Sequence, residues 1–453
     1  MITFDLPVIR RRPGGDPVLS AIRLWLLQKE TKAVISANFD RCAGRRLNNL
    51  TGRILGRKPV GIVFNATGTH STGVFSSLKS PHFSTGAQVK VRSLQTLSAL
   101  LFALASLCPA QANPSPQNAT AVVLQAFQTH DIVMLGEIHN NKQEYEWLDA
   151  LVANPEFADR VDDIVVELGN SLYQKSVDRY IAGEGVPIED VQRAWRNTLG
   201  LGPPPRIYAD FYKMVRETNL RHHGKHQIRV LGGDPYINWD NVKSEDDIGP
   251  FLGHRDQWYA QVVKDEVLVK HHRALLIAGA AHFIRGQEHP FDIEAELRRD
   301  GARTFVILAG TNAVKGYDDL DHRFESWPAP SIALLNGNWV GELTALPVIF
   351  GGTADIHSSL KLKDAADALL YLGPRDSLVR VYAAREEVSG TPYGKELLRR
   401  MALLGFNPFI PESVSDKKES TQFARPEPPS GPGTFPAPPK TMDAPLPPRP
   451  PSQ

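Results

Sequence analysis

The feature that most constrains the fold is an alternation of short apolar runs with amphipathic helical segments between residues 116 and 410. Each run has the length and aliphatic composition of a buried strand. Strands that are apolar throughout need cover on both faces, as in the parallel sheets of α/β proteins. The pattern therefore predicts a three-layer α/β sandwich with a mostly parallel sheet. The expected strands are residues 132–135, 164–168, 228–231, 274–280 and 304–308.

Helices are expected between these strands. In residues 142–152, the side chains of Tyr145, Leu148 and Leu151 fall on one stripe, which is typical of a helix packed on a sheet. The chain after Gly310 is expected to complete the sheet and to wall a pocket. The other main helices are expected at residues 119–129, 255–269 and 292–299.

A secretory signal peptide is predicted at residues 89–112. Lys90 and Arg92 form a positive region, residues 97–107 are apolar, and Ala110-Gln111-Ala112 is a small-residue cleavage site. The alternatives are a buried helix or a short membrane anchor, but the apolar run is short for a bilayer span. We therefore expect cleavage near Ala112, export to the periplasm or the extracellular space, and no transmembrane span in the mature chain.

Residues 1–88 precede this signal and are expected to lie outside the working protein. The simplest account is a start codon assigned too far upstream, and the alternative is a long leader. Residues 1–90 hold 14 Lys and Arg against 4 Asp and Glu, whereas the remainder holds 37 against 46. The acidic balance of the mature chain argues against nucleic acid as its partner.

Both cysteines, Cys42 and Cys108, precede the predicted cleavage site. The mature protein would therefore have no disulfide, thiolate nucleophile or cysteine-ligated zinc. Residues 411–453 are rich in proline and poor in large apolar side chains, so we expect a disordered tail after the α/β domain of residues 116–410. Nothing in the sequence indicates an oligomeric state.

Four of the expected strands end in residues that can carry chemistry. Glu137 and His139 follow the first strand, Glu167 ends the second, Asp234 follows the third and His282 follows the fourth. Taken singly, each is more often a cap, a turn or a packed side chain. Ligands of open parallel sheets bind beyond the carboxyl ends of the strands. Their joint occurrence therefore predicts one functional site at that edge.

The residue types allow two kinds of chemistry. His139 and His282 with Glu137, and more weakly Asp234, could bind a divalent transition metal. The same imidazoles and carboxylates also suit metal-free general acid–base catalysis. The sequence has no G-x-S-x-G, H-E-x-x-H, P-loop or G-x-G-x-x-G motif, so it leaves both possibilities open.

Several short motifs resemble one protein superfamily. "LGEIHNN", a glutamate ending the next strand, "HRDQWYAQVV" and "LLIAGAAHF" are similar to motifs of ChaN-like haem-binding uptake proteins, erythromycin esterases and Tiki/TraB proteases. The Gly-Glu-x-His spacing is most similar to the ChaN-like branch. The resemblance covers about residues 118–290 and implies the ChaN-like and erythromycin esterase-like α/β fold. By motif, its site residues fall on Glu137, His139, Glu167, Arg255 and His282.

The resemblance implies either of two functions. One is hydrolysis of an ester, lactone or amide, with a small-molecule substrate and a metal as possible cofactor. The other is non-catalytic binding of haem or iron, although "NNKQEYEW" lacks the histidine-rich continuation common after the first motif in ChaN-like proteins. A third alternative is a site that has lost its chemistry and only binds a partner. In the hydrolase, Glu137 and His139 would activate water, directly or through a metal, and Arg255 would hold an anionic group or a developing oxyanion. Glu167 would orient an imidazole, and His282 would be a second base or ligand.

Overall fold

The computed structural model describes residues 115–200, 202–222, 226–286, 293–310, 321–345, 360–405, 414–415, 419–420 and 440–449. The predicted leader and signal peptide lie outside this part of the chain, so their assignment stays a prediction. No helix within the described ranges is long and apolar enough to cross a membrane.

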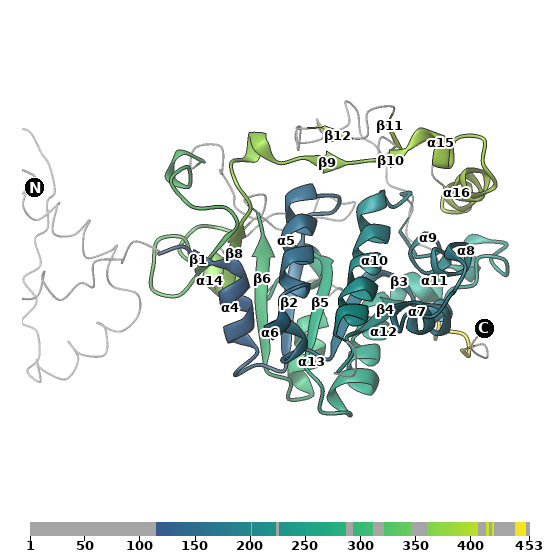
Figure 1. Cartoon of the computed structure of the whole chain (residues 1–453). Helices are drawn as coiled ribbons and strands as arrows, with labels where there is room; N and C mark the ends of the chain where they lie inside the picture. The colour runs from purple at the N-terminus through teal and green to yellow at the C-terminus, as the bar shows by residue number, and fades with distance from the viewer. Residues whose placement is uncertain are drawn as a thin grey trace, which may run out of the picture. The chain divides into compact units, whose positions relative to one another are not determined.

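The described residues form an eight-stranded sheet in the order β1-β7-β8-β6-β2-β5-β3-β4 (Figure 1). The six strands from β8 to β4 in this order are parallel, and β7 pairs antiparallel with both β8 and β1. This confirms the predicted α/β class with its mostly parallel sheet. The strands are β1 Gln117–Asn118, β2 Ile132–Glu137, β3 Asp163–Asn170, β4 Arg229–Asp234, β5 Ala274–Gly279, β6 Thr304–Ala309, β7 Ser331–Leu334 and β8 Ala368–Tyr371.

Helices cover both faces of the sheet, as Figure 1 shows. One core cluster packs α4, α5, α7 and α10 on the first face, and another packs α12, α13 and α14 on the opposite face. The helices are α4 Ala119–Ala126, α5 Lys142–Val152, α6 Pro155–Ala158, α7 Gln174–Ile181, α8 Ile188–Val191, α9 Arg193–Arg196, α10 Arg206–Arg221, α11 Gly249–Gly253, α12 Arg255–Val263, α13 Ile293–Arg299, α14 Leu362–Ala365, α15 Arg385–Val388 and α16 Pro392–Leu403.

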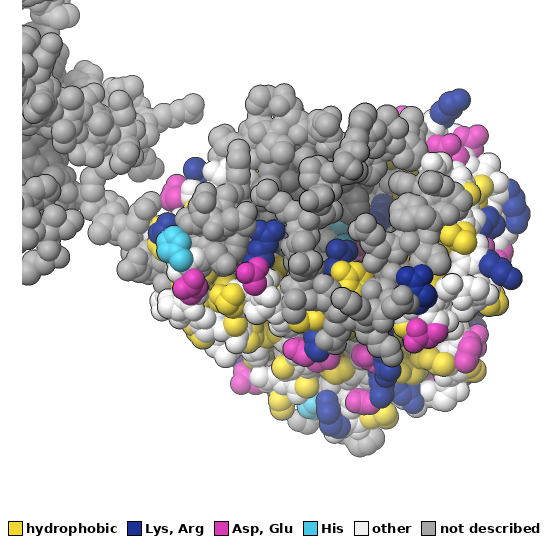
Figure 2. Space-filling model, turned by 90° about the horizontal axis from the view of Figure 1, so that it is seen from above, with side chains coloured by type: hydrophobic (Ala, Val, Ile, Leu, Met, Phe, Trp, Pro, Cys, Tyr) yellow, Lys and Arg dark blue, Asp and Glu magenta, His cyan; other side chains and the backbone are white. Residues whose placement is uncertain are grey.

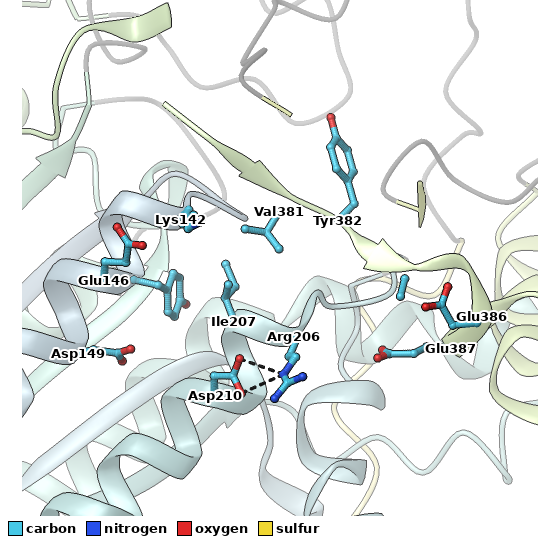
Figure 3. Close-up of a pocket in the computed structure, with 12 residues that line it drawn as sticks. Lys142, Glu146, Asp149, Arg206, Ile207, Asp210, Val381, Tyr382, Glu386 and Glu387 are labelled. Carbon is cyan, nitrogen blue, oxygen red and sulfur yellow. Dashed lines mark hydrogen bonds and ion pairs between the residues drawn. The ribbon is translucent and has the colours of Figure 1, made fainter. Parts of the chain in front are cut away.

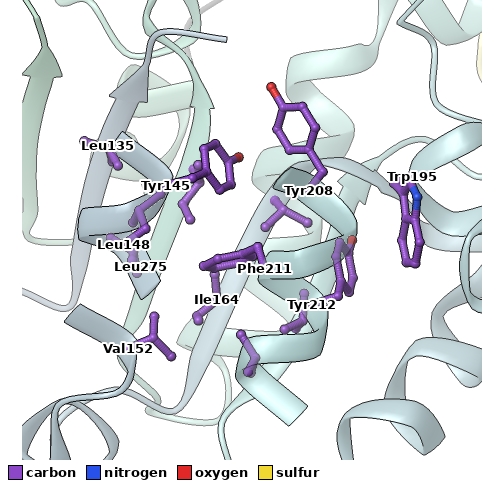
Figure 4. Packing of buried hydrophobic residues seen from close by; sticks show 14 of the residues in the cluster. Leu135, Tyr145, Leu148, Val152, Ile164, Trp195, Tyr208, Phe211, Tyr212 and Leu275 are labelled. Carbon is purple, nitrogen blue, oxygen red and sulfur yellow. The ribbon is translucent and has the colours of Figure 1, made fainter. Parts of the chain in front are cut away.

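Alternation along the central strand explains why its sequence is apolar throughout. Val133 and Leu135 of β2 belong to the cluster on the first face, whereas Ile132 and Met134 belong to the opposite cluster. Each face therefore receives every second side chain. On the first face, aromatic residues of α5 and α10 pack over the strands (Figure 4); those labelled include Tyr145, Tyr208, Phe211 and Tyr212.

The expected elements are found with small shifts at their ends. Helix α5 has the predicted bounds, whereas the helix expected over residues 255–269 is α-helical only to Val263 and continues as a π-helical turn, η3, over Lys264–Leu268. The chain after Gly310 does complete the sheet, because it supplies β7 and β8.

A strap from the end of the domain runs across the carboxyl edge of the sheet. Figure 1 shows β9 and β10 above α5 and α10, in a stretch that leads to α15 and α16. The small strands are β9 Arg380–Val381, β10 Ala383–Ala384, β11 Val414–Ser415 and β12 Glu419–Ser420. Most of the predicted tail lies outside the described residues, but residues 440–449 are described and lie against the domain.

Candidate active site at the carboxyl edge of the sheet

The strand order brings the predicted residues to one place. Strands β2, β5, β3 and β4 are consecutive neighbours, so their carboxyl ends meet at one edge. Glu137 pairs in register with Gly279 of β5, and Asn170 of β3 pairs with Asp234 of β4. Figure 2 looks onto this edge, where basic and histidine side chains appear near the centre of the face. The site residues are linked by the contacts described below.

Glu137 and His139 form a directly bonded pair. The Nδ1 atom of His139 lies 2.5 Å from Oε1 of Glu137. The hydroxyl of Tyr145 donates to Oε2 of Glu137 at 2.7 Å, and the hydroxyl of Tyr208 lies 3.3 Å from Oε1. Glu137 is buried, whereas the side chain of His139 keeps 38% of its surface exposed. The carboxylate is thus fixed in the protein while the imidazole reaches solvent.

The turn after His139 has a local explanation. Asn140 has a φ of 68°, a left-handed conformation that asparagine tolerates better than most residues. The side chain of Asn141 then caps α5 by accepting from the backbone N–H of Glu144, and Oε2 of Glu144 accepts from the backbone N–H of Ile138 at 2.9 Å. Burial and the charge of Glu137 raise the pKa of Glu144 well above its usual range. The two asparagines therefore shape the loop that presents His139.

Glu167 lies between the two histidines. Its Oε2 accepts from the backbone N–H of Gly279 at 2.7 Å and lies 3.8 Å from Nε2 of His139. Its Oε1 lies 3.0 Å from Arg255 and 3.5 Å from Nε2 of His282. Burial raises the pKa of Glu167, but the three positive partners outweigh burial and hold it well below its usual value. Glu167 is therefore an anion that joins both imidazoles.

Arg255 is held by two carboxylates. Its Nε donates to Oδ1 of Asp234 at 2.6 Å, and its guanidinium pairs with Glu167. The other oxygen of Asp234 accepts from the backbone N–H of Leu199 at 2.5 Å. Burial raises the pKa of Asp234 above its usual value despite the opposing charge of Arg255. These contacts hold Arg255 beside Glu167, and its expected role of holding an anionic group or a developing oxyanion stays a prediction.

His282 is buried and paired with a second acid. It lies in the 3-10 turn η4 Ala280–His282 directly after β5, and its Nδ1 lies 2.9 Å from Oδ1 of Asp256 on α12. Burial lowers the pKa of His282, but Glu167 and Asp256 outweigh burial and raise it to about 9. The raised pKa favours the protonated form of His282, and its expected role as a second base or ligand stays a prediction.

The pKa of His139 is also raised. Burial lowers it, but the charge of Glu167 and the hydrogen bond to Glu137 outweigh burial. Gly279 allows this imidazole to lie against β5, because a Cβ added at Gly279 would come within 2.9 Å of Nε2 of His139. A side chain at this position would displace the ring.

The sequence analysis did not identify four contributors to this site. Asp256 follows Arg255 in the quoted motif "HRDQWYAQVV", so that motif contained the signal for it. Tyr145 was assigned to the apolar stripe of its helix, and it is indeed buried, but its hydroxyl serves Glu137. Tyr208 and Gly279 carry no local signal, because their roles depend on contacts with distant parts of the chain.

The predicted metal ligands do not fit a metal ion as the structure arranges them. In the part of the chain that is described, no group of three or more His, Cys, Asp or Glu side chains is placed to hold one. Glu137 and Asp234 already accept hydrogen bonds from protein groups at both oxygens. Together with His139, these side chains therefore form a network in which they bind one another and other protein groups.

A pocket of about 370 Å³ shares one residue with this network (Figure 3). Tyr145 lines the pocket and also donates to Glu137. Five of its twelve lining residues are acidic and two are basic, and Arg206 pairs with Asp210 one turn along α10 at 3.2 Å. Burial, with the charges of Asp210 and Glu146, raises the pKa of Asp149 to about 6. A ligand in this pocket would touch the tyrosine that holds Glu137.

Comparison with known proteins yields structural neighbours of low identity. No protein-family model matches the sequence, and no curated protein does. A Bacillus cereus protein is 13% identical with a TM-score of 0.39, and the match covers 58% of this chain and 95% of that one. A succinoglycan biosynthesis protein is 12% identical with a TM-score of 0.39, covering 64% and 98%.

A structure of ChaN of Campylobacter jejuni, described as binding haem cofacially, is also similar. It is 11% identical with a TM-score of 0.27, and the match covers 55% of this chain and 91% of that one. The structural neighbours thus include a member of the branch that the sequence motifs resemble. At these identities and TM-scores, function has to be argued from the geometry of the site.

Proposed function

We propose that this chain is an exported hydrolase that cleaves an ester, lactone or amide by general acid–base catalysis. The observation that carries the proposal is the Glu137–His139 pair. A buried carboxylate lies 2.5 Å from one ring nitrogen of a partly exposed imidazole, whose other nitrogen, Nε2, lies 3.8 Å from Oε2 of Glu167. A carboxylate that orients a histidine in this way is the arrangement that general bases use in acyl transfer.

The roles follow from the charges of the network. With a proton on Nδ1 shared with Glu137, neutral His139 carries its lone pair on Nε2 and takes a proton from water as the water oxygen attacks the carbonyl carbon. Glu137 stabilises the resulting imidazolium. The bond from the carbonyl carbon to the leaving oxygen or nitrogen then breaks. The leaving group takes a proton from the imidazolium of His139, which returns His139 to its neutral form. Glu167, held by Arg255, keeps both imidazoles in place, and protonated His282 adds positive charge where negative charge develops.

The pocket beside Tyr145 supports a small-molecule substrate. Its volume of about 370 Å³ lies within the range of small-ligand sites. Because Tyr145 lines the pocket and donates to Glu137, we expect substrate binding to affect the catalytic pair through Tyr145.

The second candidate is haem binding, and one feature of His139 favours it. The Nδ1 of this imidazole is anchored by a carboxylate, and the ring is partly exposed. Histidines that ligate metals commonly donate their second nitrogen to a carboxylate in this manner. In this alternative the site would bind haem without turning over a substrate.

One variant pair separates these functions. The mature chain, residues 113–453, would be tested against a panel of activated esters, lactones and amides as wild type, as His139→Ala and as His130→Ala. His130 lies just before β2, away from the network, and is the matched control. We expect His139→Ala to lose about a hundredfold or more of kcat/KM and His130→Ala to retain it.

Retention of full activity by a folded His139→Ala would overturn the assignment of the base. Absorption spectra of the protein titrated with haem provide the second readout. If the protein hydrolyses no compound of the panel and shows a Soret band that depends on His139, haem binding would replace hydrolysis as its proposed function.

A further inference from the structure

The last described segment of the chain, residues 440–449, lies on a surface formed by the loop after β4, by η2 Glu245–Asp247, by α11 and by the start of α12. Three hydrogen bonds hold the segment on this surface: one through the side chain of Thr441 and two through main-chain carbonyl groups of the segment. The hydroxyl of Thr441 donates to the carbonyl oxygen of Asp246 at 2.9 Å. Nε2 of His254 lies 3.1 Å from the carbonyl oxygen of Ala444, and the hydroxyl of Tyr236 donates to the carbonyl oxygen of Pro447.

Two glycines allow the segment to approach closely. A Cβ on Gly253 would overlap with the carbonyl oxygen of Met442, and a Cβ on Gly249 would overlap with the hydroxyl oxygen of Thr441. The surface is therefore complementary in shape to the backbone of the segment. A tail that touched the domain only loosely would not need glycine at these two positions.

Aromatic rings form the rest of this surface. Tyr236 packs edge-on against Trp258 at 4.6 Å and against Phe251 at 5.8 Å between ring centroids. The guanidinium of Arg449 lies 5.7 Å from the Trp258 ring, and Leu446 packs on the core cluster of the first face. The segment thus contributes an apolar anchor and a cation to a surface of rings.

The sequence of the segment suits such a surface. It reads "APLPPR" from Ala444 to Arg449. Proline fixes φ, so a proline-rich segment is already extended and loses little conformational entropy on binding. Aromatic-lined surfaces that donate hydrogen bonds to the carbonyl groups of such segments are a recurring mode of peptide recognition.

We propose that the surface formed by Tyr236, Phe251, Gly253, His254 and Trp258, which we term the tail-binding surface, is a recognition site for a proline-rich peptide. Its occupant is the chain's own residues 440–449, bound within the same molecule. The site is separate from the hydrolase proposal and does not depend on it. Binding of the segment ties the C-terminal end of the chain to α11 and α12, the latter of which begins with Arg255.

The first test compares two glycine variants of the full mature chain. Gly253→Ala places a methyl group where the segment lies, whereas Gly185→Ala meets no atom within 4 Å and is the matched control. We expect trypsin to cleave after Lys440 about tenfold faster in Gly253→Ala and at the wild-type rate in Gly185→Ala. Equal cleavage in both folded variants would overturn the proposal.

The second test adds the peptide separately. In the full mature chain, Leu446→Asp with Arg449→Asp removes both anchors of the chain's own segment and so empties the surface. We expect a labelled peptide of residues 440–453 to bind this protein, and Tyr236→Phe to weaken binding about threefold to tenfold by removing one hydrogen bond.

Each remaining outcome contradicts the proposal. Absence of peptide binding would show that the surface has no recognition function. A dimer in the wild type that becomes a monomer in Gly253→Ala would show that the segment binds a second copy, and not its own chain.

Discussion

His139 and His282 share Glu167 but differ in exposure. The side chain of His139 is 38% exposed and that of His282 is 4% exposed. From sequence alone, both lie beyond strand ends, so replacing either would be expected to leave the fold intact. The structure supports that expectation for His139, whereas His282 is buried between Asp256 and Glu167. Removing it would leave two buried acids without their shared partner, which is destabilising.

The pH dependence of stability tests this difference. The pKa of His282 is about 9 in the folded state against an ordinary value of about 6.5, so its proton stabilises the fold by about 3 kcal/mol. Because the folded pKa is raised, this contribution is complete below about pH 6.5 and is lost as pH rises through about 9. We expect urea unfolding to show His282→Gln destabilised at pH 6, with its deficit relative to wild type shrinking by pH 10. A deficit that is constant with pH would contradict the pairing.

The rate of the proposed hydrolysis should depend on pH through His139. Glu167 and Glu137 together raise its pKa, so the neutral base is scarce at pH 6 and kcat/KM should rise with pH through a value above 6.5. In Glu137→Gln one of the two carboxylates is neutral, and the rising limb should move to lower pH. Profiles of kcat/KM for both proteins check this. If the rise of kcat/KM occurred at the same pH in Glu137→Gln as in the wild type, a group other than His139 would control the rate.

At the scale of elements, the strap of residues 377–381 is bonded to the loop that follows His139. The backbone N–H of Lys142 donates to the carbonyl of Val379, and the backbone N–H of Val381 donates to the carbonyl of Asn140, both at 2.9 Å. Gln143 adds two bonds: its Nε2 donates to the carbonyl of Ser377 at 2.6 Å, and its Oε1 accepts from the N–H of Val379 at 2.9 Å. The strap thus holds the loop that presents the catalytic pair.

Gln143→Ala removes the two side-chain bonds between strap and loop. At about 0.5–1.5 kcal/mol for each hydrogen bond, we expect a loss of about 1–3 kcal/mol in unfolding free energy. Because the loop presents His139, hydrolytic activity should fall as well. Exposed Gln125 on α4 provides the control substitution. If Gln143→Ala and Gln125→Ala unfold at the same urea concentration with equal activity, the strap does not support the site.

At the scale of the whole molecule, the first prediction concerns processing. If residues 89–112 act as a signal peptide, N-terminal sequencing of the exported protein should begin at or near Asn113. The physical basis is the positive region, the apolar run of residues 97–107 and the small residues at the cleavage site. Recovery of an intact chain beginning at Met1 would contradict both the signal peptide and the proposal that the start codon is assigned too far upstream.

The order of the strands in the sheet accounts for most of the site contacts that local sequence could not predict. The runs after Asp131 and Arg273 are predicted as strands from sequence, because each is apolar on both faces. Which strands are neighbours depends on the crossovers between them. The order places β5 between β2 and β3, and this brings the backbone N–H of Gly279 to Glu167 and His282 next to the same carboxylate.

The sequence by itself determined the parallel α/β class, the bounds of α5 and the acids and histidines at four strand ends, because burial and helical period act over short stretches of chain. Only the tertiary structure decided the rest. It raised the pKa of His282 and paired Arg255 with Glu167 and Asp234, because the pKa of a side chain depends on partners from other strands and helices. It also recruited Asp256 and Tyr145 and seated residues 440–449 on the domain. These contacts join residues far apart in the chain, and apart from the motif that contains Asp256 no local pattern indicates them.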